Sequence, residues 1–410
     1  MKNNTGYRIL ADGCAMSNDS RRTKLNNNDV IIGPSGAGKT RSYVLPNILQ
    51  GNESMIITDT KGSILSEVRG PLERAGYEIM QIDLRRMTGD VGYNPLDYIG
   101  RDGPDGACDE LDIMTAANCI LPLENRKDPF WEQAACNLIA SLISYTLDCL
   151  PEQEHHLGSV SQLLMHADSG VVAQLMEELG TESPDHFAYQ RYSMFMAGER
   201  ADKMQASICG IAANSLNMLT SRRALRLYTA EKRVRFSELA QKKTALILTV
   251  SDSNRAFDKL VTLFYTQALQ ALIRYADSLP EHRLPVPVRF IFDDFATYAR
   301  IPDFDSVIAT IRSREIYASL ILQDLLQLED RYGHAKAMTI LNCCDNLLFL
   351  GGQDITTAEF IAKRANLTVS TVLRMPLDEA FLFTRGQPPR RVRKFDLSSH
   401  PAYQSEAEPS

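Results

Sequence analysis

The chain has 410 residues, of which 44% are hydrophobic and 23% charged, a composition ordinary for a soluble globular protein of about two domains. The net charge of −7 argues against a uniformly basic nucleic-acid coat, although it leaves room for a locally basic channel. The eight cysteines are dispersed and the seven histidines lack zinc-ligand spacing, which disfavours a disulfide scaffold and a structural zinc site. No uninterrupted apolar stretch is long enough to span a membrane, so we expect a soluble chain without a transmembrane segment.

The most specific motif begins at Gly33. Eight consecutive residues match the phosphate-binding loop pattern G-x-x-x-x-G-K-[ST], and we expect all of them to bind a nucleotide: Gly33, Pro34, Ser35, Gly36, Ala37, Gly38, Lys39 and Thr40. The apolar run 30–32 indicates a buried strand before this loop, and residues 41–50 indicate a helix after it. Glycines allow backbone N–H groups to surround a phosphate, and the start of a helix favours the same anion. Lys39 should reach the β- and γ-phosphates, and the Thr40 hydroxyl should ligate Mg²⁺.

The order of predicted elements indicates one α/β domain built from both ends of the chain, with a helical domain inserted. Strands alternate with helices at both ends, which is typical of a parallel sheet. The expected strands cover residues 30–32, 55–58, 77–82, 244–250, 288–292, 317–322 and 346–350. Turn-forming residues at 100–104 suggest a boundary, and helical patterns then dominate from 109 to about 230. We therefore predict a nucleotide-binding domain from residues 1–104 and 233–404, an all-α domain at 105–232, and a disordered tail at 405–410.

A second group of candidate site residues follows two strands of the C-terminal half. Asp293 and Asp294 close an apolar strand, where a P-loop enzyme needs one carboxylate for the Mg²⁺ shell and another to polarise the attacking water. Gln323 closes the next strand, where a polar group can sense the γ-phosphate or position water. Arginines just before that strand, Arg312 and Arg314, suit a finger that reaches a neighbouring subunit's site. The alternative is a solvated, arginine-rich turn and a capping glutamine.

Taken together, these motifs resemble the type IV secretion coupling proteins, the ATPases that feed DNA into conjugative transfer channels. The resemblance covers most of the chain. The matching segments are the loop 33–40 with Pro46-Asn47, then Thr58-Asp59-Thr60-Lys61-Gly62, Tyr93-Asn94-Pro95-Leu96-Asp97, Phe130-Trp131, Asp293-Asp294-Phe295-Ala296, Arg312-Ser313-Arg314, Gln323, Tyr332-Gly333, Asn342-Cys343 and Gly351-Gly352. So many matches in the same order are far more specific than a lone phosphate-binding loop.

The resemblance implies a RecA-like P-loop NTPase fold with a mostly parallel twisted sheet, and an ATPase that uses ATP and Mg²⁺. It implies that Lys39 binds phosphate, that Thr40 and Asp293 ligate the metal, that Gln323 is the sensor, and that Arg312 is the finger, with Arg314 as the second choice. The implied partners are DNA, relaxase and relaxosome proteins, type IV secretion channel ATPases and inner-membrane components. The implied assembly is a homo-hexamer at the cytoplasmic face of the cell membrane.

Two departures from the family pattern bear on these expectations. Family members usually carry glutamate where this chain has Asp294, so the base is one methylene shorter and hydrolysis is expected to be slower. They also usually begin with transmembrane helices, so this chain is either an excised cytosolic portion or relies on a membrane partner.

Several alternatives stay open. Asp59 and Lys61 either shape the site or the subunit contact, or form a helix cap with a surface lysine. The basic stretch 385–394 either touches a phosphate backbone or forms a solvated closing strand. The alternatives to a DNA pump are an ATP-gated recruitment adaptor with little motor activity and a related hexameric DNA translocase outside conjugation. A small-molecule P-loop kinase is disfavoured because the motifs extend far beyond the phosphate-binding loop.

Overall fold

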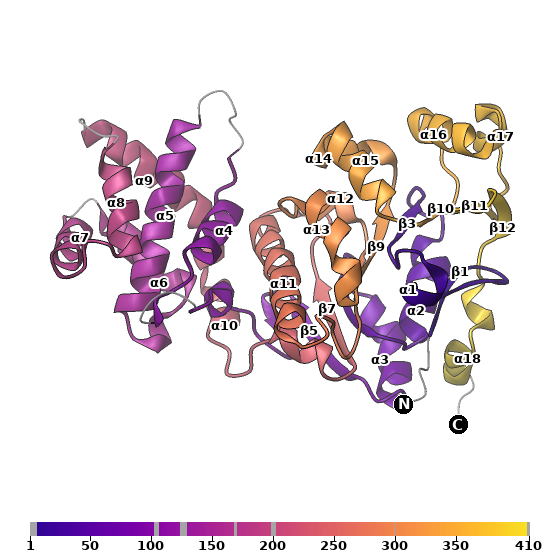
Figure 1. The fold of residues 1–410 in the computed structure, drawn as a ribbon, viewed down its shortest axis with the longest axis horizontal. Coiled ribbons are helices and arrows are strands. Elements are labelled where there is room, and N and C mark those ends of the chain that lie inside the picture. The colour runs from indigo at the N-terminus through magenta and orange to yellow at the C-terminus, as the bar shows by residue number, and fades with distance from the viewer. Residues whose placement is uncertain are drawn as a thin grey trace. The chain divides into compact units, whose positions relative to one another are not determined.

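The computed structural model describes residues 6–101, 106–123, 129–167, 170–197, 202–298 and 300–407. The chain divides into two compact units (Figure 1). The sheet unit contains Met1–Asp83, Arg235–Ser253 and Leu269–Ser410, and the helical unit contains Leu84–Val234 and Asn254–Ala268. Both ends of the chain thus belong to the sheet unit, with the helical unit between them in sequence.

The sheet unit is built around a mostly parallel sheet whose strands lie in the order β12-β11-β10-β3-β9-β8-β4-β7-β5. The strands from β10 to β5 in that order pair in parallel, and β11 and β12 extend the sheet with antiparallel pairs. Their bounds are β3 Asp29–Ile32, β4 Ser54–Asp59, β5 Glu78–Asp83, β7 Thr244–Thr249, β8 Val288–Phe292, β9 Ile316–Leu322, β10 Asn346–Phe349, β11 Glu379–Thr384 and β12 Arg390–Arg393. All seven expected strands are therefore confirmed.

Additional strands lie near the two ends of the chain. Strands β1 (Tyr7–Ala11) and β2 (Cys14–Ser17) form an antiparallel hairpin that is not among the expected strands. The positive φ of 63° at Gly13 permits the tight turn between them. Strand β12 carries exposed arginines, an arrangement that both alternatives for the basic stretch 385–394 allow.

The central strands carry mostly apolar side chains on both faces of the sheet, and helices cover both faces, so these strands are buried throughout. On one face, Ile31, Ile57 and Ile291 share a hydrophobic core with residues of η1 (Thr40–Val44), α2 (Leu45–Leu49) and α3 (Ile64–Arg74). Since side chains alternate along a strand, Phe292 points to the other face, where it contacts Phe295 of α12 (Phe295–Tyr298) and Phe304 of α13 (Phe304–Thr310).

The remaining helices of this unit lie mostly in the C-terminal part. They are α1 Ser20–Thr23, α14 Leu325–Tyr332, α15 His334–Asn342, α16 Ile355–Ala365, α17 Val369–Leu373 and α18 Pro401–Ala407; the long helix α11, Asp258–Ser278, contributes residues to both units. Helix α18 continues past Ser405, where the sequence predicts the start of a disordered tail, and residues 408–410 lie outside the described residues.

The helical unit is centred on α5 (Phe130–Cys149), which packs against α4, α6, α8 and α9 (Figure 1). Its interior side chains recur at helical spacing, as in Leu138, Ile139, Leu142 and Ile143, all fully buried. The other helices are α4 Glu110–Ile120, α6 Leu157–Met165, α7 Val171–Glu182, α8 Phe187–Ala197, α9 Asp202–Leu216 and α10 Arg222–Tyr228. Within the described ranges, no helix has the length and apolar composition needed to cross a membrane.

The helical unit begins earlier than the turn-forming residues suggest. The sequence places the boundary at residue 104, which lies outside the described residues, whereas the compact unit begins at Leu84. The reason is packing within this unit: the Tyr93 hydroxyl donates to Gln267 Oε1 at 2.6 Å, and its ring meets that of Phe264 edge-on at 5.1 Å. Residues after β5 thus pack with the helices although they carry no helical pattern of their own.

Candidate nucleotide-binding site

The candidate site lies where three neighbouring parallel strands end. Strand β9 lies between β3 and β8, and the register pairs Ile32 with Leu322 and Phe292 with Leu320. The carboxyl ends of parallel strands lie at one edge of a sheet, so the residues that follow them share that edge. Here these residues are Gly33, Asp293 and Gln323. Topology alone thus brings Asp293 and Gln323 to the loop at Gly33, although they follow it by 260 and 290 positions in the sequence.

The loop after β3 has the backbone conformation that its glycines permit. Gly36 and Gly38 have φ angles of 80° and 91°, in the region that side chains disfavour. Gly33 lies so close to its neighbours that an added Cβ would meet the Cβ atoms of Ala37 and Leu350 at 3.0 and 3.1 Å. The loop closes through the hydrogen bond from Ala37 N to Pro34 O, at 3.1 Å. A larger residue at these glycines would deform the loop.

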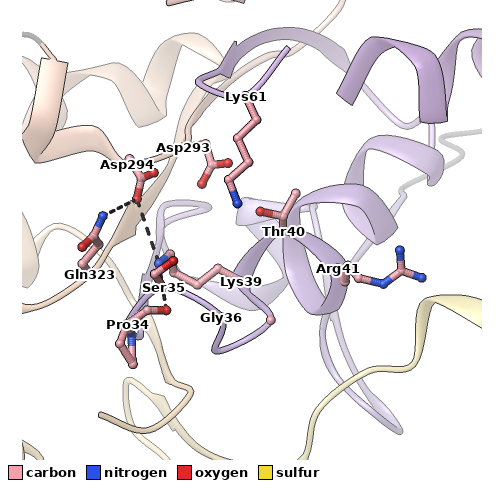
Figure 2. A pocket seen from close by; sticks show the side chains of 11 residues that line it. Pro34, Ser35, Gly36, Lys39, Thr40, Arg41, Lys61, Asp293, Asp294 and Gln323 are labelled. Carbon is pink, nitrogen blue, oxygen red and sulfur yellow. Dashed lines mark hydrogen bonds and ion pairs between the residues drawn. The ribbon is translucent and has the colours of Figure 1, made fainter. Parts of the chain in front are cut away.

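The loop and the two other strand ends line one pocket (Figure 2). The lining residues are Pro34, Ser35, Gly36, Gly38, Lys39, Thr40, Arg41, Lys61, Asp293, Asp294 and Gln323. The predicted metal ligands, Thr40 and Asp293, therefore face the same space, as do the predicted catalytic residues Lys39, Asp294 and Gln323. Gly33 and Ala37 belong to the loop but do not line the pocket.

Lys39 lies folded over its own loop. Its ammonium donates to Gly33 O at 2.7 Å and to Pro34 O at 3.2 Å, and lies 4.0 Å from Asp294 Oδ1 (Figure 2). Burial lowers the pKa of Lys39 below its ordinary value, although the carboxylates of Asp294 and Asp293 act in the opposite direction. A desolvated ammonium of this kind gains most from an additional anion in the pocket.

Asp293 is a carboxylate whose charge the protein compensates poorly. Burial, together with the adjacent Asp294, raises its pKa to about 7, and Lys39 and Lys61 only partly offset this. A cation next to Asp293 would remove that penalty. The Thr40 hydroxyl and the Asp293 carboxylate are hard oxygen donors of the kind that Mg²⁺ prefers. In the described part of the chain, no group of three or more His, Cys, Asp or Glu residues could hold a metal ion.

Asp294 has a backbone conformation that few residues adopt. Its φ is 54°, in the left-handed region that aspartate tolerates better than most side chains. Its Oδ1 accepts a hydrogen bond from Gln323 Nε2 at 3.3 Å, and Gln323 Oε1 accepts one from Gln327 Nε2 at 3.4 Å. Strained residues of this type concentrate at functional sites, so the geometry is consistent with a working carboxylate.

The structure does not bring Arg312 to this pocket. It lies in the short helix η8 (Ile311–Arg314), where its Nη2 donates to Ser20 O at 3.4 Å. Arg314, the second choice for the finger, is held by a bidentate ion pair in which its Nε and Nη2 lie 2.8 and 2.9 Å from the carboxylate oxygens of Asp277. Neither arginine therefore acts on the pocket of its own chain.

The segment after β4 combines both readings that the sequence leaves open. Asp59 Oδ1 accepts hydrogen bonds from the backbone N–H groups of Lys61, Gly62 and Ser63, and Oδ2 accepts one from Ile64. Asp59 thus caps helix α3, while Lys61 extends into the pocket (Figure 2). Arg41 also lines the pocket but is not among the predicted site residues. Its place directly after Thr40 is the sequence signal that points to it.

The sequence of this chain is similar to those of known proteins. The sequence model of the family described as Type IV secretory system Conjugative DNA transfer matches residues 19–370. The protein VirD4 of Rhizobium radiobacter is 25% identical over 338 residues, which cover 82% of this chain and 47% of that protein. The chain spans about half the length of the first relatives that it matches.

Solved structures share the fold. The plasmid coupling protein TrwB in complex with the non-hydrolysable ATP analogue ADPNP has a TM-score of 0.70 and 15% identity, covering 95% of this chain and 89% of that chain. TrwB in complex with ADP and Mg²⁺ has a TM-score of 0.69 and the same identity, covering 95% and 88%. The predicted fold, an α/β P-loop NTPase domain with a mostly parallel sheet and an inserted helical part, is thereby confirmed. Since the family's sequence model covers most of the chain, this protein belongs to the type IV secretory system conjugative DNA transfer family.

Proposed function

We propose that this chain is an ATP-hydrolysing coupling protein that recruits DNA and moves it into a type IV secretion channel. The observation that carries the proposal is the single pocket in which the phosphate-binding loop, Asp293, Asp294 and Gln323 meet. The family match supports the transfer role. The TrwB structures, whose descriptions name an ATP analogue, ADP and Mg²⁺, support ATP as the nucleotide.

Each pocket residue has a distinct task in this proposal. The loop N–H groups and Lys39 bind and orient the phosphates, and the charge of Lys39 stabilises the negative charge that develops on them. When bound, Mg²⁺ would supply further positive charge, with the Thr40 hydroxyl and the Asp293 carboxylate as its protein ligands. Asp294 accepts the proton of the attacking water, and the Gln323 amide, hydrogen-bonded to Asp294, orients that water.

Arg312 belongs to the same proposal as a residue that acts on a neighbouring subunit. Its position outside the pocket of its own chain is what a finger supplied to a neighbour requires. We therefore propose a ring, most simply a homo-hexamer, at the cytoplasmic face of the membrane. Its pore would hold DNA through phosphate contacts and stacking. Relaxase and relaxosome proteins, channel ATPases and inner-membrane components would be its partners.

The test is the steady-state ATPase rate with and without single- and double-stranded DNA. The rate should rise with DNA at low salt, and this stimulation should decline as salt competes for the phosphates. The size of the assembly, measured by light scattering with and without ATP and DNA, should increase under the same conditions. An ATPase rate that does not change when single- or double-stranded DNA is added at low salt would contradict the motor role.

A second candidate, an ATP-gated recruitment adaptor, is favoured by the geometry of Asp294. This short side chain is tied to Gln323 and lies 4.0 Å from Lys39, so its carboxylate is partly occupied by protein partners. The variant Asp294→Glu extends the carboxylate by one methylene. A rise in turnover of about 10²-fold would support the adaptor, because the native chain would then be limited by its base. Unchanged or lower turnover would support the motor.

A further inference from the structure

Lys394 lies directly after β12 and contacts the phosphate-binding loop from outside the pocket. Its Nζ donates to Ala37 O and to Leu350 O, both at 2.9 Å. Ala37 is in the loop, and Leu350 directly follows β10. The lysine thus joins three segments that are distant in the sequence. It also lies beyond residue 370, the last residue that the family's sequence model matches.

The backbone of Lys394 is held in place, so its ammonium has a defined position. Lys394 N donates to Asp378 O at 2.8 Å, and the preceding carbonyl, Arg393 O, accepts from Asp12 N at 3.0 Å. Leu350 N donates to Ile32 O at 2.8 Å, so the second acceptor of the ammonium is itself fixed to the strand that enters the loop. Lys394 is half-buried, so its N–H groups are partly removed from water and rely on these carbonyl partners. Burial also lowers its pKa.

The contact with Ala37 O determines the direction of one loop amide. Ala37 O and Gly38 N belong to the same planar peptide group, in which the C=O and N–H bonds point in opposite directions. Because the carbonyl points to Lys394, the Gly38 N–H points away from it, and Gly38 lines the pocket. In the described part of the chain, that N–H has no backbone acceptor. An amide oriented in this way is available to an anion.

We propose that Lys394 is a positioning residue of the nucleotide site: by holding Ala37 O, it keeps the Gly38 N–H directed at the phosphates. This inference rests on the proposed ATP binding and adds to it a residue that never touches the nucleotide. Without the ammonium, the peptide between Ala37 and Gly38 can rotate, since the φ of 91° at Gly38 is only one of the conformations open to glycine. The site would then lose a charge-assisted hydrogen bond.

The test compares Lys394→Met with Lys394→Arg and with Arg390→Met, a control at an exposed position of β12. Isothermal titration with Mg·ATP and Mg·ADP should show Kd values about tenfold higher for Lys394→Met, the cost of one hydrogen bond to a charged group. Lys394→Arg should recover most of the affinity, and Arg390→Met should match the native chain. Native-like Kd values for a folded Lys394→Met would overturn the inference.

A spectroscopic measurement separates positioning from a general loss of structure. Labelling with ¹³C-carbonyl alanine and ¹⁵N-glycine restricts the NMR spectrum to the Ala–Gly peptides, of which the sequence contains three. The Gly38 amide should shift on Mg·ADP addition in the native chain and should shift much less in Lys394→Met. An equal shift in both would overturn the inference.

Two further outcomes are also informative. If Lys394→Met does not fold, Lys394→Leu, which also lacks a donor for Ala37 O, is titrated instead, and a native Kd for it counts against the inference. If the native chain itself binds no nucleotide, the proposed function fails first, and the inference fails with it.

Discussion

The parallel strands of the sheet carry charged groups at their amino ends and at their carboxyl ends. The protein compensates the charges at the amino ends far better than those at the carboxyl ends. At the amino end of β3, the carboxylate of Asp29 accepts hydrogen bonds from Arg8 Nε at 2.6 Å, the Tyr43 hydroxyl at 2.6 Å and Asn346 Nδ2 at 2.8 Å. At the carboxyl end of β8, Asp293 lies in the pocket with no such set of protein donors among the described hydrogen bonds, in the company of a second carboxylate. One carboxylate is satisfied by the protein and the other is not.

The pKa values express this difference. Burial alone would raise the pKa of Asp29, but Arg8 and Arg289 outweigh burial and hold that pKa below its ordinary value of 3.8. At Asp293 burial wins, and the pKa is about 7. The comparison indicates that the charged groups at the amino ends stabilise the fold, whereas those at the carboxyl ends remain available to bind a ligand.

The largest expected effect is that of Lys39→Ala, which tests whether the charged groups at the carboxyl ends of the strands serve ligand binding. ATP hydrolysis should fall to background, and Mg·ATP binding should become too weak to measure, because the pocket loses its phosphate-binding cation. Stability should stay unchanged or rise slightly, because a desolvated ammonium is removed. Phosphate release and thermal unfolding measure the two quantities. Hydrolysis that survives the substitution would remove Lys39 from the site.

The opposite pattern is expected for Asp29→Asn, which tests the amino ends. The change removes the anion that pairs with the buried cation Arg8, while Arg289 keeps its ion pair with Glu53. The uncompensated charge of Arg8 should cost the sheet unit about 3–5 kcal/mol. Hydrogen–deuterium exchange of β3 and β9 amides should accelerate about 10²–10³-fold, and exchange in α5 serves as the internal control. The Kd for Mg·ATP of the folded variant should stay within about threefold of the native value. Native exchange rates in β3 would show that the network is dispensable.

The pH dependence of this effect has a definite sign. The folded-state pKa of Asp29 lies below 3.8, so its stabilisation is fully present above that pH and is lost as the pH falls through the folded-state value. The difference between the native chain and Asp29→Asn should therefore stay constant at neutral and mildly acidic pH and narrow only in strong acid. A difference that already narrows near neutral pH would point to another titrating group.

The two ends also differ in how far the sequence predicts them. The pocket could be predicted because each of its parts carries a local signal, a glycine pattern or a carboxylate pair after an apolar strand, and the parallel topology then joins them. Asp29 and Arg289 carry no such signal: each is a single charge beside an apolar run, and only the register of the sheet shows that they are neighbours. Lys394 lies 357 positions from Ala37, so only the folded structure could reveal their contact.

The smallest expected effect is that of Arg314→Ala. The charge of Arg314 is already paired within the chain, as that of Asp29 is, but the pair of Arg314 lies at the surface. Its bidentate hydrogen bonds to Asp277 lower the pKa of that carboxyl, yet Asp277 is largely exposed, so the pair should contribute less than about 1 kcal/mol to stability. Arg314→Ala should change the ATPase rate less than about twofold, because a guanidinium committed to Asp277 is not available to a neighbouring site. Arg312→Ala, measured in parallel at a concentration where rings form, should lower the rate about 10³-fold if Arg312 is the finger. A larger loss for Arg314→Ala than for Arg312→Ala would reverse the assignment and imply that the ion pair with Asp277 opens when subunits meet.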